Sequence, residues 1–197
     1  MINLFIQWLK RLFGFTSLEN YNMDDTTREL LHEKVEFYRG LNTPDKQLFE
    51  QRILMFIDNT SIIGRGVELT LEDCLLIASS AIIPVWAFPN WHYFNLRKVI
   101  LVPAAFNEQR QFGQPDSNIT GMVGTGFMAG KMLLSKPALH YGFLNSVDKK
   151  NVGIHEFAHL IDMADGSCDG FPERLSQYAI FAPWMHFVEN KIEQIKN

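Results

Sequence analysis

Ile154-His155-Glu156-Phe157-Ala158-His159-Leu160-Ile161 is the stretch that decides the fold of this chain, because its residues repeat with the period of a helix. His155 and His159 are four residues apart, so they share one face of an α-helix, one turn from each other. Apolar residues fill most of the other positions, which predicts a helix packed against the core. Asp165-Gly166 follows as a stop signal.

The same residues predict a chemistry. Two imidazoles one helical turn apart can both reach one Zn²⁺ at about 2.0–2.1 Å, and a carboxylate beside the first can act as a general base. We therefore expect His155 and His159 to bind a single zinc ion and Glu156 to be the catalytic residue of a metallohydrolase. The alternative is a helix whose two histidines are satisfied by carbonyl groups or water.

A hydrolytic zinc needs a third protein ligand, and the residues alone leave it open. An HExxHxxGxxH arrangement, or its variant ending in Asp, would place glycine at 162 and the ligand at 165, whereas this chain has Asp162 and Asp165. A second arrangement takes a glutamate from a later helix, where Glu189 or Glu193 could serve. Asp162 is better interpreted as a residue that orients an imidazole or hydrogen-bonds at the helix end.

Composition limits the class of protein. The chain has 197 residues, 47% of them hydrophobic and 13% aromatic, which is enough for the core of one domain with a helical appendage. A net charge of −4 without a long basic run argues against nucleic-acid binding and leaves peptide, protein or small-molecule substrates open. Cys74 and Cys168 form no CxxC pair, so we expect no disulfide framework and a cytoplasmic location.

The segment Met1–Phe15 is predicted to be an amphipathic helix, because its polar residues fall on one narrow stripe. Fifteen residues are too few to span a bilayer, which needs about 20. Lys10-Arg11 also interrupts the apolar run that a secretory signal requires. We expect this helix to pack on the domain or on a partner, with in-plane membrane contact as the alternative.

Capping signals predict the helices of the first eighty residues. They open at Asp24-Asp25, at Thr43-Pro44-Asp45, and at Thr70 with Asp73 three residues on. Two short strands, Val99–Val102 and Lys131–Leu134, then precede the motif helix. The predicted fold class is α+β, with helices first and then a small mixed sheet backed by the motif helix. The second strand is expected to align an extended peptide by edge pairing.

Several blocks of the chain, within residues 27 to 195, resemble the Mlc titration factor A family of bacterial glucose-regulated zinc metallopeptidases. Order and spacing agree as well as the metal motif. The blocks are Phe37-Tyr38 with Leu41, Phe49-Glu50 with Arg52, Ile63 to Thr70, Trp91-His92-Tyr93 with Asn95-Leu96-Arg97, Gly130 with Leu134-Ser135, Asn151-Val152, His155 to Asp162, Asp165-Gly166, Gly170, Pro172 and Trp184.

The resemblance implies a zincin-like, specifically gluzincin-like, metallopeptidase domain over residues 16–197. In that family the third zinc ligand is a glutamate far downstream of the second histidine, with a catalytic tyrosine shortly before it. This sequence stops at Asn197, before both would fall, so we expect a C-terminally truncated member. The resemblance also implies peptidase activity on small substrates and binding of the repressor Mlc. The competing hypothesis is a catalytically incomplete protein-binding module that keeps the fold.

Overall fold

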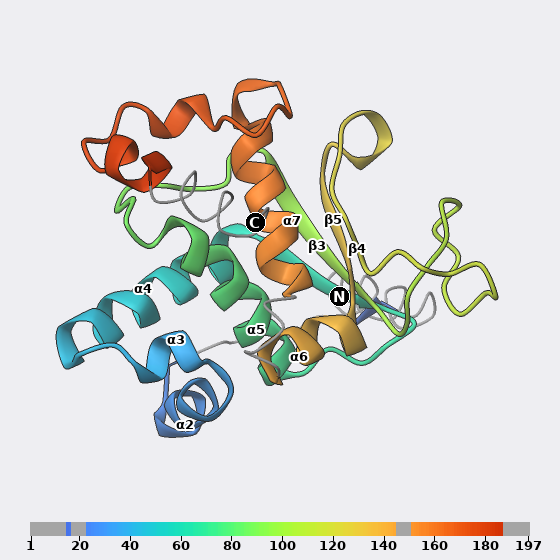
Figure 1. Ribbon diagram of the computed structural model, residues 1–197. Helices are drawn as coiled ribbons and strands as arrows, with labels where there is room; N and C mark the ends of the chain where they lie inside the picture. The colour runs from blue at the N-terminus through green and yellow to red at the C-terminus, as the bar shows by residue number, and fades with distance from the viewer. Residues whose placement is uncertain (1–14, 17–22, 145–150, 187–197) are drawn as a thin grey trace, which may run out of the picture.

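The computed structural model describes residues 15–16, 23–144 and 151–186 (Figure 1). The expected helix of Met1–Phe15 lies outside the described residues except for Phe15, which belongs to a strand. Residues 181–186 are helical. In chain order the elements are β1 (Phe15–Thr16), α2 (Asp25–Lys34), α3 (Glu36–Arg39), α4 (Thr43–Asn59), β2 (Ser61–Arg65), α5 (Leu71–Ile82), η1 (Ile83–Val85), β3 (Leu96–Val102), β4 (Gly121–Met122), η2 (Gly126–Met128), β5 (Gly130–Ser135), α6 (Lys136–Leu144), α7 (Val152–Asp162), η3 (Met163–Asp165) and η4 (Glu173–Leu175).

The helix starts follow the capping signals closely. Asp24 caps α2 by accepting a hydrogen bond from the backbone N–H of Thr27. Thr70 and Asp73 form the expected capping box at the start of α5. For α4 the cap is Asn42 rather than Thr43, because the Asn42 side chain accepts from Asp45 N and Thr43 is already helical. The three helix starts are confirmed to within one residue.

The sheet is mixed, with the strand order β1-β2-β3-β5-β4. Strands β2, β3 and β5 are parallel, whereas β1 and β4 pair antiparallel at the two edges. Both predicted strands are confirmed, but β2 was not expected. The edge-pairing hypothesis for Lys131–Leu134 is wrong, because β5 lies between β3 and β4, and Leu133 and Leu134 already pair with Met122 and Gly121.

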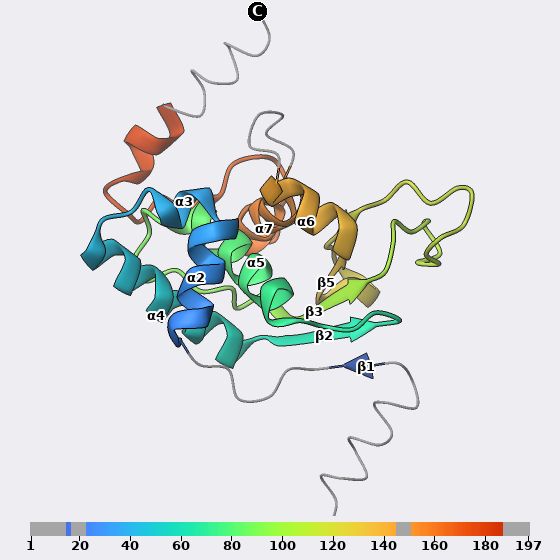
Figure 2. The same cartoon turned by 90° about the horizontal axis from the view of Figure 1, so that it is seen from below.

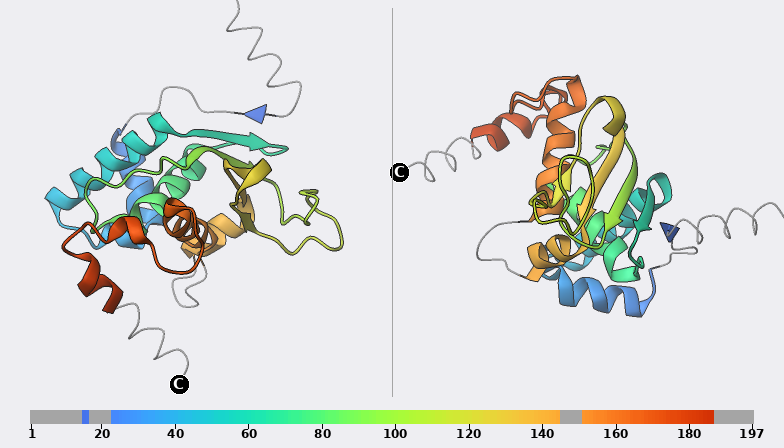
Figure 3. Two further views of the ribbon diagram at one scale, coloured as in Figure 1. Left: turned by 90° about the horizontal axis from the view of Figure 1, so that it is seen from above. Right: turned by 90° about the vertical axis from the view of Figure 1, so that its right-hand side faces the viewer.

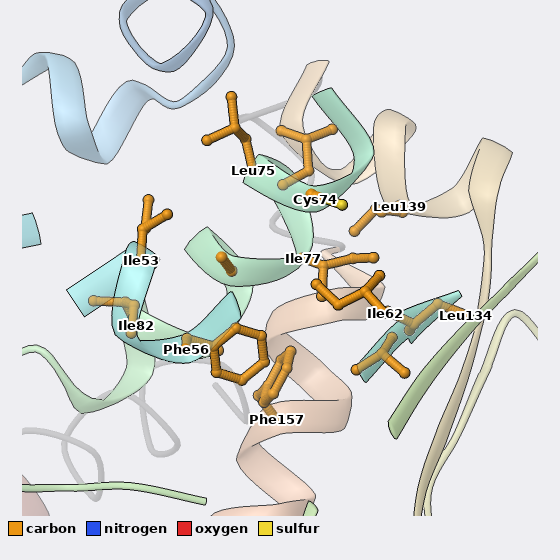
Figure 4. Close-up of a cluster of buried hydrophobic side chains, with 14 of the residues drawn as sticks. Ile53, Phe56, Ile62, Cys74, Leu75, Ile77, Ile82, Leu134, Leu139 and Phe157 are labelled. Carbon is orange, nitrogen blue, oxygen red and sulfur yellow. The ribbon is translucent and has the colours of Figure 1, made fainter. Parts of the chain in front are cut away.

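Side chains of the sheet belong to two apolar clusters, one on each face, because successive residues of a strand point to opposite faces. Val99 and Leu101 of β3 join the main core. Figure 4 shows side chains of α4, α5 and α7 that meet in this core. Val102 of β3 and Leu133 of β5 instead pack with Phe106 of the 103–120 segment. That segment extends away from the helices (Figure 2). The helices therefore cover one face of the sheet.

Helix α7 occupies the centre of this arrangement. It lies beside the β4–β5 hairpin, with α6 next to its first turns (Figures 1 and 3). Phe157 is fully buried and packs against Phe56 and Tyr93 with ring centroids 5.6 and 5.0 Å away. Among the residues that the structure describes, no helix combines the length and the apolar character that a membrane span requires.

Candidate active site

Helix α7 (Val152–Asp162) carries the motif, as its periodicity predicts. Asn151 caps it by accepting from the backbone N–H of Ile154 at 3.0 Å. The helix tightens into η3 at its end, and Gly166 then takes a left-handed conformation with φ of 102°, which glycine adopts without steric cost. The predicted stop at Asp165-Gly166 is confirmed.

His155 and His159 project from one face of α7, and their Nε2 atoms converge to 3.1 Å. Two nitrogens that bind one ion at about 2.0–2.1 Å in tetrahedral geometry lie about 3.3 Å apart, so this pair fits a shared metal ion. His155 is exposed and His159 half-buried. Loss of part of the water around the His155 ring and the proximity of His159 lower the pKa of His155, which favours the neutral imidazole that metals bind.

Glu156 lies on the side of α7 that meets strand β4, and only 6% of its surface is exposed. Burial raises the pKa of its carboxyl to about 7, although the backbone N–H of Val123 donates a hydrogen bond that lowers it. A Cβ atom at Gly121 would lie 2.7 Å from Cγ and Oε1 of Glu156. Glycine at this position therefore allows the strand to approach the carboxylate closely.

Helix α7 is held in place by contacts with distant parts of the chain. A Cβ atom at Gly153 would lie 2.3 Å from Oγ of Ser80, so α5 and α7 cross at close range. The side chain of Asn95 donates from Nδ2 to the carbonyl of Leu160 at 2.7 Å and so satisfies an acceptor in the last turn. Asn151 also donates from Nδ2 to the Gly142 carbonyl of α6 at 3.1 Å.

A cavity of about 850 Å³ opens beside the motif. Residues from three parts of the fold line it. These are Thr120 and Gly121 at the start of β4, Pro137, Ala138 and Tyr141 of α6, and Asn151, Val152, His155 and Glu156 at and after the start of α7. A volume of this size is typical of ligand pockets. The cleft therefore brings a histidine and the buried carboxylate to the lining of one cavity.

No third metal ligand joins the two histidines among residues 15–16, 23–144 and 151–186, since no group of three His, Cys, Asp or Glu side chains there could hold an ion. Asp165 instead accepts hydrogen bonds from the backbone N–H groups of Ser167 and Glu173, so its candidacy as the ligand is not supported. Asp162 accepts from the Gly170 N–H at 3.0 and 3.1 Å, consistent with the helix-end role. Glu189 and Glu193 lie outside the described residues.

Two functional contacts were not predicted from the sequence. Asn151 stands directly before the helix, where Asn is a common cap, so its capping role could have been found. Asn95 bonds to a carbonyl 65 residues away, and no local pattern signals such a contact.

Comparison with known proteins finds two sequence matches for the chain. A family model described as glucose-regulated metallo-peptidase M90 matches residues 6–197. An uncharacterized protein of Synechocystis sp., slr2042, is 28% identical over 173 residues, which is 84% of this chain. The match covers 62% of the Synechocystis protein, so the chain spans less than two thirds of the length of this relative.

Proposed function

Because the chain belongs to the glucose-regulated metallopeptidase M90 family, we propose that it is a zinc-dependent peptidase with a zincin-like, gluzincin-type domain over residues 16–197. In this proposal His155 and His159 hold one zinc ion and Glu156 is the general base. The observation that carries it is the convergence of the two Nε2 atoms to 3.1 Å on the helix that presents a carboxylate with a pKa of about 7.

The roles follow from the surroundings of each side chain. A bound zinc ion would polarise the scissile carbonyl and lower the pKa of a water molecule to about 7. Glu156 takes a proton from the water as it adds to the carbonyl carbon, and then donates that proton to the leaving amine. A pKa near the working pH suits a group that must both accept and release a proton.

The substrate in this proposal is a peptide or protein segment in extended conformation. Strand β4 is the outermost strand of the described sheet on the side of the cleft, and Gly121 lies against Glu156. A peptide that pairs with β4 would extend the sheet and carry its backbone past the motif helix. Strand β4 thus takes the peptide-pairing role that the sequence suggested for β5, because β5 lies between β3 and β4.

The second candidate function is a catalytically incomplete, regulator-binding module. One observation favours it: the described residues bring together two convergent ligands rather than three. Two ligands bind zinc less firmly than three. The family resemblance suggests a transcriptional repressor as the partner, whereas the net charge of −4 without a long basic run argues against a nucleic acid. In-plane membrane contact by Met1–Phe15 remains the alternative role for that segment.

Zinc content and peptide hydrolysis, measured together, separate the two functions. We expect zinc to bind in a 1:1 ratio, His155→Ala to abolish binding, and Glu156→Gln to retain zinc but reduce hydrolysis by at least about 100-fold. His32→Ala, which removes an exposed histidine of α2, is the control and should change neither. Zinc binding without hydrolysis would favour the second function, and unchanged zinc content in His155→Ala would reject the metal site.

A further inference from the structure

Helix α6 forms one wall of the cleft. Pro137, Ala138 and Tyr141 line the same cavity as His155 and Glu156. Residues 137, 138 and 141 share one helix face because positions three and four apart are neighbours on a helix. Tyr141 is 52% exposed, so a large aromatic surface faces solvent at the edge of the cavity.

The other sides of α6 are occupied, which fixes the orientation of this face. Leu139 is fully buried in the main core. Lys136 and His140 contact the buried carboxylate of Asp73, with Nζ at 2.8 Å and Nε2 at 2.6 Å from its oxygens. Because these contacts hold the helix from two sides, Tyr141 is presented to the cleft by a rigid element.

The charges of the cleft restrict what it can accommodate. Among the described residues that line the cavity, His155 and Glu156 are the only ones with an acidic or basic side chain, and both are assigned to the reaction. Against Pro137, Ala138 and Tyr141, away from the proposed metal, a charged substrate side chain would therefore lose water without gaining an ion pair, which is costly. An aliphatic or aromatic side chain would bury apolar surface against Pro137, Ala138 and the Tyr141 ring.

We propose that this wall is a specificity subsite for an uncharged apolar or aromatic side chain next to the scissile peptide bond, and that Tyr141 is its main determinant. The inference rests on the proposed peptidase function, because the cleft is taken as the place where the peptide lies. It adds the class of residue that the substrate must carry there.

Peptide binding can be measured without turnover. Fluorescein-labelled pentapeptides of Gly and Ala that differ only in a central Phe, Leu, Asp or Lys are titrated, with zinc present, against the Glu156→Gln protein. We expect the Phe and Leu peptides to bind about tenfold more tightly than the Asp and Lys peptides. Adding Tyr141→Ala should reduce this ratio to below about threefold, whereas Tyr141→Phe should keep it.

Two further variants keep the test decisive. Tyr141→Lys places a cation at an exposed position and should shift the preference toward the Asp peptide. Phe127→Ala removes an exposed ring, 69% accessible, from the loop between β4 and β5, and should leave the ratio unchanged. A Phe preference that survives both Tyr141→Ala and Tyr141→Lys would overturn the inference.

Hydrolysis by the wild-type chain is assayed with the same peptides, so that the two proposals fail separately. If the wild type cleaves none of them while the binding preference depends on Tyr141, the peptidase function is wrong for this chain and the subsite stands as a peptide-binding site. If the wild type cleaves all four peptides at equal rates and Tyr141→Ala changes none of these rates, the subsite is wrong and the peptidase function stands.

Discussion

Glu156 is a carboxyl group that the fold largely shields from bulk solvent. Its side chain is 6% exposed between α7 and β4, and burial raises its pKa to about 7. In the folded protein without a bound cation, burial therefore favours the protonated form of the Glu156 carboxyl group. This makes the residue sensitive to pH in the range where a peptidase would work.

The sign of the pH effect on stability follows from this shift. Between pH 4.5 and 7 the unfolded chain has lost the Glu156 proton while the folded chain still holds it, so stability falls as pH rises, by about 3 kcal/mol at most. We expect Glu156→Gln to stabilise the metal-free protein more at pH 8 than at pH 5. Urea unfolding in a chelator measures this, with the exposed Glu29→Gln as the control. Equal effects of Glu156→Gln at both pH values would contradict the buried position.

Asn95 anchors the last turn of the motif helix through its 2.7 Å hydrogen bond to the Leu160 carbonyl. We expect Asn95→Ala to lower the free energy of unfolding by about 1–3 kcal/mol, because the carbonyl loses a partner inside the structure. Asn59→Ala is a matched control, since Asn59 also donates to a helical carbonyl, at 2.7 Å from Met55 O, but at an exposed position. Thermal unfolding should show a cost for Asn59→Ala below about 0.5 kcal/mol, and equal costs would argue against the anchoring role.

At the residue level, the sequence predicted that the two histidines converge. It did not predict the contacts that hold their helix in place. His155 and His159 meet because four residues make about one helical turn, which is a local property. Asn95 acts across 65 positions, and the elevated pKa of Glu156 depends on β4 lying against α7. Such contacts arise from tertiary packing and leave no periodic signal.

At the scale of elements, the close crossing of α5 and α7 determines how near the motif helix lies to α5. Gly153→Ala would place a Cβ atom 2.3 Å from Ser80 Oγ and 2.8 Å from Ser80 Cβ, so we expect it to cost about 1–3 kcal/mol through overpacking. Ser80→Gly removes both atoms and should recover part of this loss in the double variant. A double-mutant cycle by urea unfolding should give a coupling energy of at least about 0.5 kcal/mol. Additive effects would show that the helices separate freely.

The contact between α5 and α6 depends on Asp73. Burial alone would raise the pKa of Asp73, but hydrogen bonds from His140, Lys136 and Thr70 outweigh it and lower that pKa. The stabilisation is therefore present above pH 3.8 and is lost as pH falls through the folded-state value. We expect Asp73→Ala to cost about 2–4 kcal/mol at pH 7, measured by urea unfolding.

Asp45 provides the control for this prediction. It occupies the same position in α4, three residues after the cap, but it is only half-buried. Asp45→Ala should cost less than about 1 kcal/mol. A similar loss in both variants would mean that Asp73 acts only on its own helix and does not fix α6.

Capped helices and buried strands were predictable as elements, whereas β2 and α6 were not expected. The buried part of β2 is only Ile62 to Gly64, too short for a period to be distinguished from the helical pattern around it. Helix α6 begins directly after β5, with Pro137 in its first turn. A proline at that place is compatible with both a turn and a helix start.

At the scale of the whole molecule, the parallel strands β2, β3 and β5 form the centre and the antiparallel β4 faces the cleft. The sequence predicted a small mixed sheet backed by the motif helix, and this is confirmed. The strand order depends on pairing between residues up to 50 positions apart along the chain, as for Phe15 and Arg65, and patterns of neighbouring residues do not reveal such pairs. The family match over residues 6–197 and the position of α7 against this sheet together support a peptidase fold.

Anomalous diffraction at the zinc edge from crystals of the zinc-soaked protein tests the central claim most directly. We predict a single strong peak at about 2.0–2.1 Å from Nε2 of both His155 and His159, on the side of the cleft where Glu156 is presented. A peak elsewhere, or histidine rings that turn apart with no density between them at saturating zinc, would contradict the metal site and the catalytic role derived from it.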